Sequence, residues 1–147
     1  MKGNLGSTSL KRLSTCCHPL YETVTVAANH PDNPCEFGVA CGGRGKADQN
    51  KAYFSGHSAA EWGESFHNVM CGDNFFSMAV DVWPYDNIRR DYIYDNKELH
   101  LKLINHIITV GHELGYNIES GADFKTIEGG DTAHLQISFR AWNHGMV

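Results

Sequence analysis

The segment GGDTAHLQIS, residues 129–138, places a carboxylate three residues before an imidazole, Asp131 and His134. The two glycines before them are typical of a turn, and HLQIS has the alternation of a short strand. Histidine is a common metal ligand, and a carboxylate beside zinc can take a proton from bound water, whose pKa falls to about 7. The spacing therefore indicates either a metal-dependent hydrolytic site or a coincidence.

A second unusual carboxylate is Asp81, which lies inside the apolar segment SMAVDVWP, residues 77–84. An unpaired ion buried there would be strongly unfavourable, so we expect a salt bridge, backbone hydrogen bonds or a metal as its partner. With His67 of GESFHN and His134, Asp81 makes two imidazoles and one carboxylate, a set that leaves a fourth zinc position for water.

Spacing alone does not select these three residues. Comparable pairs of imidazole and carboxylate are found at other places in the chain: His57 with Glu64, His67 with Asp73, and His30 with Asp32. The elements that carry each residue must therefore decide which side chains can meet.

Hydrophobic periodicity predicts those elements in a mixed order. Helices are predicted over residues 9–29, with a break or kink at Pro19, over 48–56, and over 96–115, and strands over 35–41, 77–84 and 134–142. Asn96 is a suitable N-cap for the long helix, and Gly115 can end it. Residues 57–76 are predicted to form a loop. We expect an α+β fold, with a small antiparallel sheet packed against helices in a single compact domain over residues 9–147, and a flexible segment at 1–8.

Composition argues against several classes of protein. The net charge of −5 argues against a nucleic-acid-binding surface, and the hydrophobic fraction of 41% is typical of a globular domain. Five cysteines without regular spacing predict free thiols from a reducing compartment. The sequence contains no apolar run long enough for a membrane span and no secretory signal at its N-terminus, so we expect no stable membrane association.

The order of these motifs resembles the M15 family of zinc peptidases, which includes D-alanyl-D-alanine carboxypeptidases and L-alanyl-D-glutamate peptidases. Members of that family carry the patterns R-T-x-x-x-Q, S-x-H-x-x-G-x-A-x-D, G-G-D-W/F and D-x-P-H-F. The corresponding segments here are GGRGKADQ, SFHN, FSMAVDV and GGDTAHL, and the likeness spans roughly residues 9–138. It is closest to small single-domain phage endolysins, and it implies a hedgehog/DD-peptidase-like fold.

The resemblance also implies a role for individual residues. Asp131 would act as the general base, and Arg44 would donate hydrogen bonds to the oxyanion that forms at the scissile carbonyl. The implied zinc ligands are His67, Asp81 and His134, and the implied substrate-binding residues are Gln49 and Ser65.

The chain departs from the family pattern between the first two ligands. His67 and Asp81 are fourteen residues apart, because the segment VMCGDNF is inserted, and Gly72, Asp73 and Asn74 are predicted to form a turn at its tip. Asp81 is the preferred ligand and Asp73 the weaker substitute. Glu128 is a second candidate base.

The resemblance implies a zinc peptidase that cleaves the peptidoglycan stem peptide, at the L-alanyl-D-glutamate bond rather than at a D-alanyl-D-alanine bond. Its biological role would be host cell lysis by a phage. Such a monomeric enzyme, made in the host cytoplasm without a signal peptide, would act in the periplasm or cell wall after a holin releases it. An alternative from another class is a non-catalytic, metal-stabilised, wall-binding module on the same fold.

Overall fold

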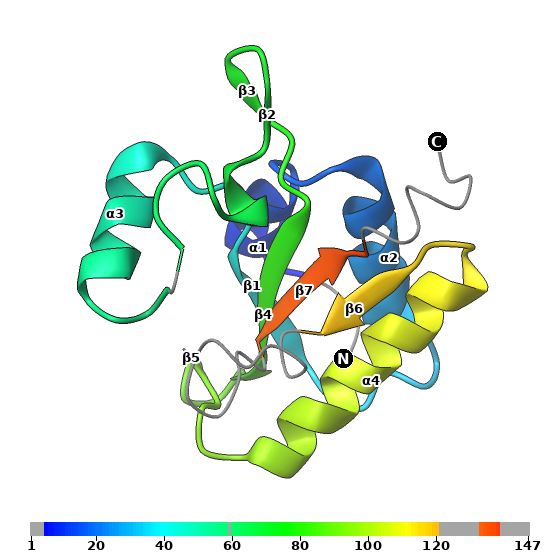
Figure 1. Cartoon of the computed structure of the whole chain (residues 1–147). Helices are drawn as coiled ribbons and strands as arrows, with labels where there is room; N and C mark the ends of the chain where they lie inside the picture. Colours follow the sequence, from blue (N-terminus) through cyan, green and yellow to red (C-terminus); the bar gives the residue numbers. More distant parts are fainter. Residues whose placement is uncertain (1–4, 59, 121–132, 139–147) are drawn as a thin grey trace.

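The structure is a computed structural model of the 147-residue chain, and it describes residues 5–58, 60–120 and 133–138. In these residues, helices pack around an antiparallel sheet (Figure 1). The helices are α1 (Ser7–Leu13), α2 (His18–Asn29), α3 (Lys46–Phe54), the 3-10 helix η1 (Phe66–Asn68) and α4 (Lys97–Glu113). The strands are β1 (Phe37–Cys41), β2 (Met70–Cys71), β3 (Asn74–Phe75), β4 (Ala79–Asp86), β5 (Asp91–Tyr92), β6 (Ile118–Ser120) and β7 (His134–Ile137).

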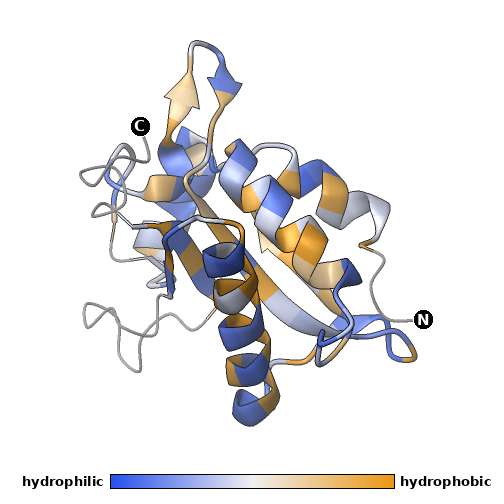
Figure 2. Ribbon diagram, turned by 90° about the vertical axis from the view of Figure 1, so that its right-hand side faces the viewer, coloured by the Kyte–Doolittle hydropathy of each residue, from blue (hydrophilic) through white to orange (hydrophobic). Residues whose placement is uncertain are grey.

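Strand β4 is the centre of the main sheet. The strand order is β1-β4-β7-β6, and β5 pairs with the far end of β4. Every pairing is antiparallel. Strands β2 and β3 form a separate hairpin, which projects from the domain in Figures 1 and 2. The predicted α+β domain with a small antiparallel sheet is confirmed.

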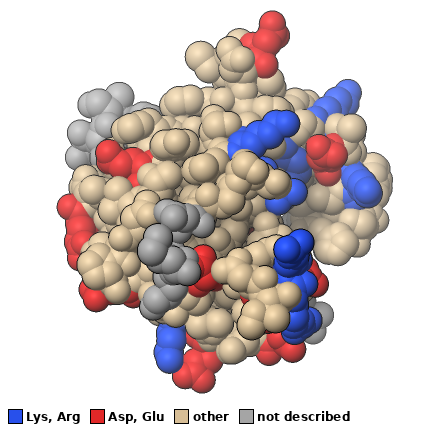
Figure 3. Space-filling view, turned by 180° about the vertical axis from the view of Figure 1, so that it is seen from behind, with Lys and Arg blue, Asp and Glu red and all other residues tan. Residues whose placement is uncertain are grey.

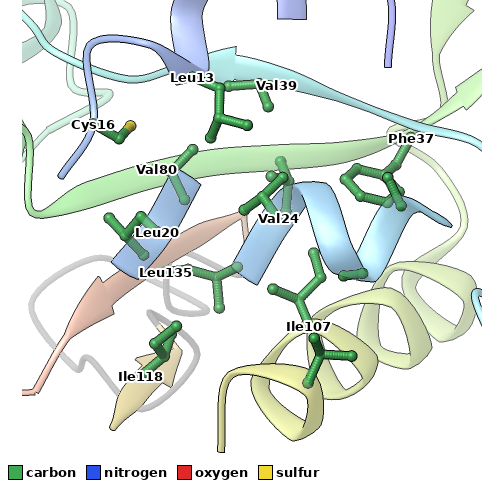
Figure 4. Close-up of a cluster of buried hydrophobic side chains, with 14 of the residues drawn as sticks. Leu13, Cys16, Leu20, Val24, Phe37, Val39, Val80, Ile107, Ile118 and Leu135 are labelled. Carbon is green, nitrogen blue, oxygen red and sulfur yellow. The ribbon is translucent and has the colours of Figure 1, made fainter. Parts of the chain in front are cut away.

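One face of the sheet forms the hydrophobic core. Successive side chains of a strand point to opposite faces, so Val80 and Val82 of β4 share the core face with Leu135 of β7. These side chains are fully buried, and helices α2 and α4 cover them (Figure 4). The opposite face of β4 and β7 is therefore left for polar side chains.

Helix α4 follows its sequence pattern closely. Asn96 accepts a hydrogen bond from the Leu99 backbone N–H at 3.1 Å, which is the predicted N-cap. Gly115 follows the helix with a φ of +91°, a conformation that glycine adopts without a steric penalty. Hydrophobic and hydrophilic residues alternate along the helices in Figure 2, as their amphipathic pattern predicts.

Three boundaries differ from the prediction. Residues 9–29 form two helices, α1 and α2, and Pro19 lies in the first turn of α2, where its missing N–H leaves no bond unmade. Helix α1 begins at Ser7, inside the segment predicted to be flexible. Pro84 does not end β4, which continues to Asp86, because β7 pairs with β4 only as far as Asp81 and needs no N–H from Pro84.

The segment predicted as a loop, residues 57–76, contains helix η1 and the β2–β3 hairpin. Strands β5 and β6 were not predicted, because two or three residues are too short for a periodic pattern to emerge. The predicted strand 134–142 is described as β7 up to Ile137, and its part beyond Ser138 lies outside the described residues.

No helix in the described ranges is long and apolar enough to cross a membrane. On the face shown in Figure 3, Lys and Arg side chains are interspersed with Asp and Glu.

Candidate metal centre

The polar face of the sheet brings Asp81 and His134 together. These residues are directly paired across β4 and β7, and residues paired in this way project from the same face. Gln136 of β7 and Glu119 of β6 pair one step further along and lie on that face too. Two residues of the predicted ligand set are therefore positioned by strand register alone.

His67 reaches the same point from helix η1. The Ser65 hydroxyl accepts a hydrogen bond from the His67 backbone N–H at 3.1 Å, and Asn68 completes a capping box with Ser65. The His67 carbonyl accepts a hydrogen bond from the Arg44 N–H at 2.8 Å. His67 is only 2% exposed, so its ring is held in place on several sides.

The segment between His67 and Asp81 folds back on itself and keeps these two residues together. Two backbone hydrogen bonds close its base, from Phe76 N–H to the Val69 carbonyl at 2.8 Å and from Met78 N–H to the Phe66 carbonyl at 3.0 Å. Gly72 has a φ of +63° in the hairpin turn. Asp73 is exposed in that turn, whereas Asp81 faces both histidines.

The three side chains meet at distances typical of a shared metal. The Asp81 Oδ1 atom lies 3.2 Å from His67 Nε2 and 3.4 Å from His134 Nδ1, and the two ring nitrogens are 3.3 Å apart. Ligands bonded tetrahedrally to zinc at about 2.0–2.2 Å are about 3.3–3.6 Å from one another. The three atoms thus have nearly the separations of three zinc ligands.

Each histidine ring makes a hydrogen bond through the nitrogen that points away from Asp81. In the neutral ring, the other nitrogen then has a lone pair that points toward Asp81. His67 Nδ1 lies 2.7 Å from the Gly42 carbonyl, which can only accept, so this nitrogen carries the proton. Gln136 donates its amide to Glu119 at 2.8 Å, so its Oε1 accepts from His134 Nε2, also at 2.8 Å. In the neutral rings, His67 Nε2 and His134 Nδ1 are then unprotonated and face Asp81. Such outer hydrogen bonds are typical of histidine metal ligands.

These contacts determine the protonation of the site without a metal. Burial disfavours the His67 cation, but the adjacent Asp81 carboxylate outweighs this effect and raises the pKa of His67 to about 10. Burial also disfavours the Asp81 anion, but the two histidines hold the pKa of Asp81 well below its usual range. Asp81 Oδ1 is buried, and the ring nitrogens of His67 and His134 are its neighbours at 3.2 Å and 3.4 Å. Without a metal, protonated His67 therefore supplies the positive charge beside Asp81, and a metal ion would take the place of that proton.

Arg44 approaches the other oxygen of Asp81. Its Nη2 lies 3.5 Å from Asp81 Oδ2, and its Nη1 donates to Gln49 Oε1 at 3.0 Å. Gln49 is fully buried, and its amide group also donates to Ser58 and to the Ala60 carbonyl. The substrate-binding role of Gln49 stays a prediction. In this structure, the contacts of Gln49 hold the Arg44 side chain in position.

Several contributing residues were missed by sequence reasoning. Asn68 donates to the Arg44 carbonyl at 3.0 Å and to Gln49 at 3.1 Å, and Gln136 orients His134. The position of Gln136, two residues after His134 on a strand, was a usable signal because such residues share a face. Cys41 is a third, since its sulfur, a His67 ring nitrogen and an Asp81 oxygen all lie within 4.8 Å of one another.

Two predicted residues cannot be placed. The proposed base Asp131 and the second candidate Glu128 lie outside the described residues. Of the other pairs considered, His30 Nδ1 lies 3.9 Å from Asp32 Oδ2 and accepts a hydrogen bond from the Asp32 backbone N–H, and the Asp32 side chain is exposed. His57 Nδ1 is hydrogen-bonded to the exposed Ser55 hydroxyl at 2.8 Å.

Comparison with known proteins supports the architecture. No family model matches the chain, and no curated protein matches it. Among solved structures, the Serratia marcescens L-Ala D-Glu endopeptidase ChiX is similar, with a TM-score of 0.72 over 95% of this chain and 94% of that chain. The two chains share a fold. At 20% sequence identity, the likeness concerns the fold, so the chemistry must be argued from the site.

Proposed function

We propose that this protein is a zinc-dependent peptidase of the M15 type that hydrolyses a peptide bond in the stem peptide of peptidoglycan. The observation that carries the proposal is the convergence of His67 Nε2, His134 Nδ1 and the buried Asp81 Oδ1 within 3.2–3.4 Å. The fold shared with an L-Ala D-Glu endopeptidase supports it. Two imidazoles and one carboxylate are a donor set of catalytic zinc.

Zinc held by His67, Asp81 and His134 would supply a Lewis acid and lower the pKa of a water molecule. Arg44 would bind the carbonyl oxygen of the scissile bond and stabilise its negative charge, since its guanidinium is already held beside the centre by Gln49 and Asp81. Asp131 would accept a proton from the attacking water and deliver it to the leaving amine.

The bond we propose is L-alanyl-D-glutamate, as in the name of the structurally similar enzyme. A D-alanyl-D-alanine bond is the alternative that the M15 resemblance leaves open. The proposed biological role is that of a phage endolysin, which would reach the cell wall through a holin lesion and lyse the host.

The first experiment combines metal analysis with a digest. The purified protein is expected to contain one zinc ion per chain and to release peptides with N-terminal D-glutamate from peptidoglycan, identified by mass spectrometry. A chelator should stop the release, and added zinc should restore it. Free D-alanine as the product would assign the other bond, and zinc-loaded protein without any cleavage would reject the enzymatic proposal.

Matched variants test the ligand and base assignments. Asp81→Ala and His134→Ala should lose both zinc and cleavage, whereas Asp73→Ala should retain both because Asp73 lies at the exposed hairpin turn. Asp131→Ala should lose cleavage while zinc stays bound. If Asp73→Ala loses zinc and Asp81→Ala keeps it, the ligand assignment is wrong.

A further inference from the structure

Cys41 lies beside two of the proposed metal ligands, His67 and Asp81. Its Sγ, a ring nitrogen of His67 and an oxygen of Asp81 all lie within 4.8 Å of one another. Cys41 is half-buried, and its thiol lies 3.5 Å from the neighbouring Gly42 carbonyl and interacts with His67. Neither the two-histidine, one-carboxylate pattern nor the proposed hydrolysis uses this side chain.

An irregularity in β1 turns Cys41 toward the site. Val39 pairs with Val82, but Cys41 pairs with Asp81, so β1 advances two residues where β4 advances one. In a regular strand, Cys41 would project from the same face as Val39, which is fully buried in the core. The bulge at Ala40 places Cys41 on the face of Asp81 instead. Bulges beside functional sites commonly redirect a side chain in this way.

Asp81 also indicates a cation site at this point. Its buried Oδ1 lies 3.2 Å from His67 Nε2 and 3.4 Å from His134 Nδ1, which are nearly the separations of zinc ligands. Cys16 is a useful contrast, because its thiol is buried in the core and contacts the Ala79 carbonyl at 3.7 Å. Cys41, in contrast, lies beside His67 and the buried Asp81 carboxylate.

We propose that Cys41 is a fourth protein ligand of the metal in the substrate-free protein. The inference rests on the proposed metal site. On binding, the S–H bond of Cys41 breaks, its proton passes to solvent, and the sulfur donates an electron pair to the ion without any oxidation. With His67, Asp81 and His134, the set becomes four protein ligands, which closes the centre until Cys41 withdraws.

A thiolate ligand also changes which metals the site prefers. Soft sulfur donors favour zinc, cadmium and other soft ions over magnesium, calcium and manganese, which prefer oxygen. The substrate-free protein should therefore bind cadmium more tightly than a variant without the thiol. Regulation follows from the same contact, because substrate must compete with Cys41 for one coordination position.

The test is cobalt substitution of the metal-free protein under reducing conditions. The wild-type protein should bind one Co²⁺ per chain and show a thiolate-to-cobalt charge-transfer band in the near ultraviolet. Cys41→Ser and Cys41→Ala should still bind one Co²⁺ but lack the band. Cys71→Ser is the matched control, since Cys71 is exposed on β2, and it should keep the band.

A second measurement compares metal affinities by competition. Both Cys41 variants should lose at least about tenfold in cadmium affinity relative to the wild-type protein, with a smaller loss for zinc. Stoichiometric Co²⁺ without the band in the wild-type protein would overturn the role of Cys41 and leave the proposed metal site standing. Failure of the wild-type protein to bind Co²⁺ or Zn²⁺ would instead overturn the metal site itself. A band that persists in both Cys41 variants would also overturn the assignment.

Discussion

The two carboxylate oxygens of Asp81 face different partners. Oδ1 faces the rings of His67 and His134, and Oδ2 lies 3.5 Å from the Arg44 guanidinium. Arg44 is therefore fixed between Asp81 and Gln49 before any substrate arrives. A donor held in this way needs little reorganisation when charge develops on a carbonyl oxygen, which is the condition for strong electrostatic stabilisation.

Replacing Arg44 with lysine tests this arrangement. Lysine keeps the positive charge but cannot donate to Gln49 and to a carbonyl oxygen through one planar group. We expect the turnover of Arg44→Lys on stem peptide to fall by about 10²-fold, the effect typical of removing one oxyanion donor, while bound zinc stays at the wild-type level. Arg89→Lys, at an exposed position, is the control. Unchanged turnover in Arg44→Lys would remove Arg44 from the mechanism.

Gln136 orients His134, a proposed metal ligand. Its Oε1 accepts a hydrogen bond from His134 Nε2 at 2.8 Å, so Nδ1 is the ring nitrogen that faces Asp81. Gln136→Leu should raise the zinc dissociation constant by about 10–100-fold, because outer hydrogen bonds orient a ligating ring. Zinc titration of the metal-free protein measures this constant. Wild-type affinity in a folded Gln136→Leu protein would contradict the assigned orientation of His134.

Among the elements, the turn after β1 connects most parts of the site. The Gly42 carbonyl binds His67, and Arg44 follows two residues later. A Cβ atom at Gly42 would overlap the Arg12 carbonyl in the last turn of α1, and one at Gly43 would overlap the Phe75 ring on β3. The turn is thus packed between α1 and the hairpin, so only glycine permits this close approach.

Gly42→Ala is therefore expected to disturb stability and metal binding together. The turn must move to accommodate the methyl group, at a cost of about 1–3 kcal/mol, and its carbonyl must shift away from His67. Gly45→Ala is the matched control, because the nearest atom to its added Cβ is 3.8 Å away. Urea unfolding and zinc titration of both variants measure the effects. Equal behaviour of the two variants would show that the turn is not tightly held.

At the scale of the whole molecule, the free energy of unfolding should depend on pH in opposite directions in the metal-free and the metal-bound protein. In the metal-free protein, this dependence comes from the ion pair of His67 and Asp81. In the metal-free protein, the pKa of His67 is raised from 6.5 to about 10, so its contribution is complete below the unfolded value and is lost as pH rises toward 10. The pKa of Asp81 is lowered from 3.8, so its contribution is lost in acid. With metal, the ligands must be deprotonated, and stabilisation grows as pH rises.

Urea unfolding measured between about pH 6 and about pH 9 distinguishes the metal-free from the metal-bound protein. With chelator, the free energy of unfolding should fall as pH rises, by at most about 1.4 kcal/mol per pH unit from this one group. With zinc, the additional stabilisation should increase over the same interval. In His67→Gln with chelator, the fall in the free energy of unfolding that comes from His67 should be absent. A metal-free protein whose pH profile matches that of His67→Gln would contradict the ion pair.

The sequence predicted correctly those elements that depend on interactions between residues close together in the chain. Helix α4, its Asn96 cap and Gly115 were predicted because capping and amphipathic periodicity involve neighbouring residues. The apolar strand around Asp81 was predicted for the same reason. The short strands β5 and β6 were missed because their pairing partners, not their own few residues, make them strands.

By itself, the sequence determined the helices and longer strands, the α+β class, and the resemblance that named His67, Asp81, His134 and Arg44 as site residues. Only the tertiary structure decided that Asp81 and not Asp73 faces the histidines, because the inserted hairpin closes on its own base and returns the chain to β4. It also decided the orientation of both rings and the placement of Cys41. These depend on strand register, a bulge and carbonyl groups distant in sequence, and such non-local geometry has no periodic signal along the chain.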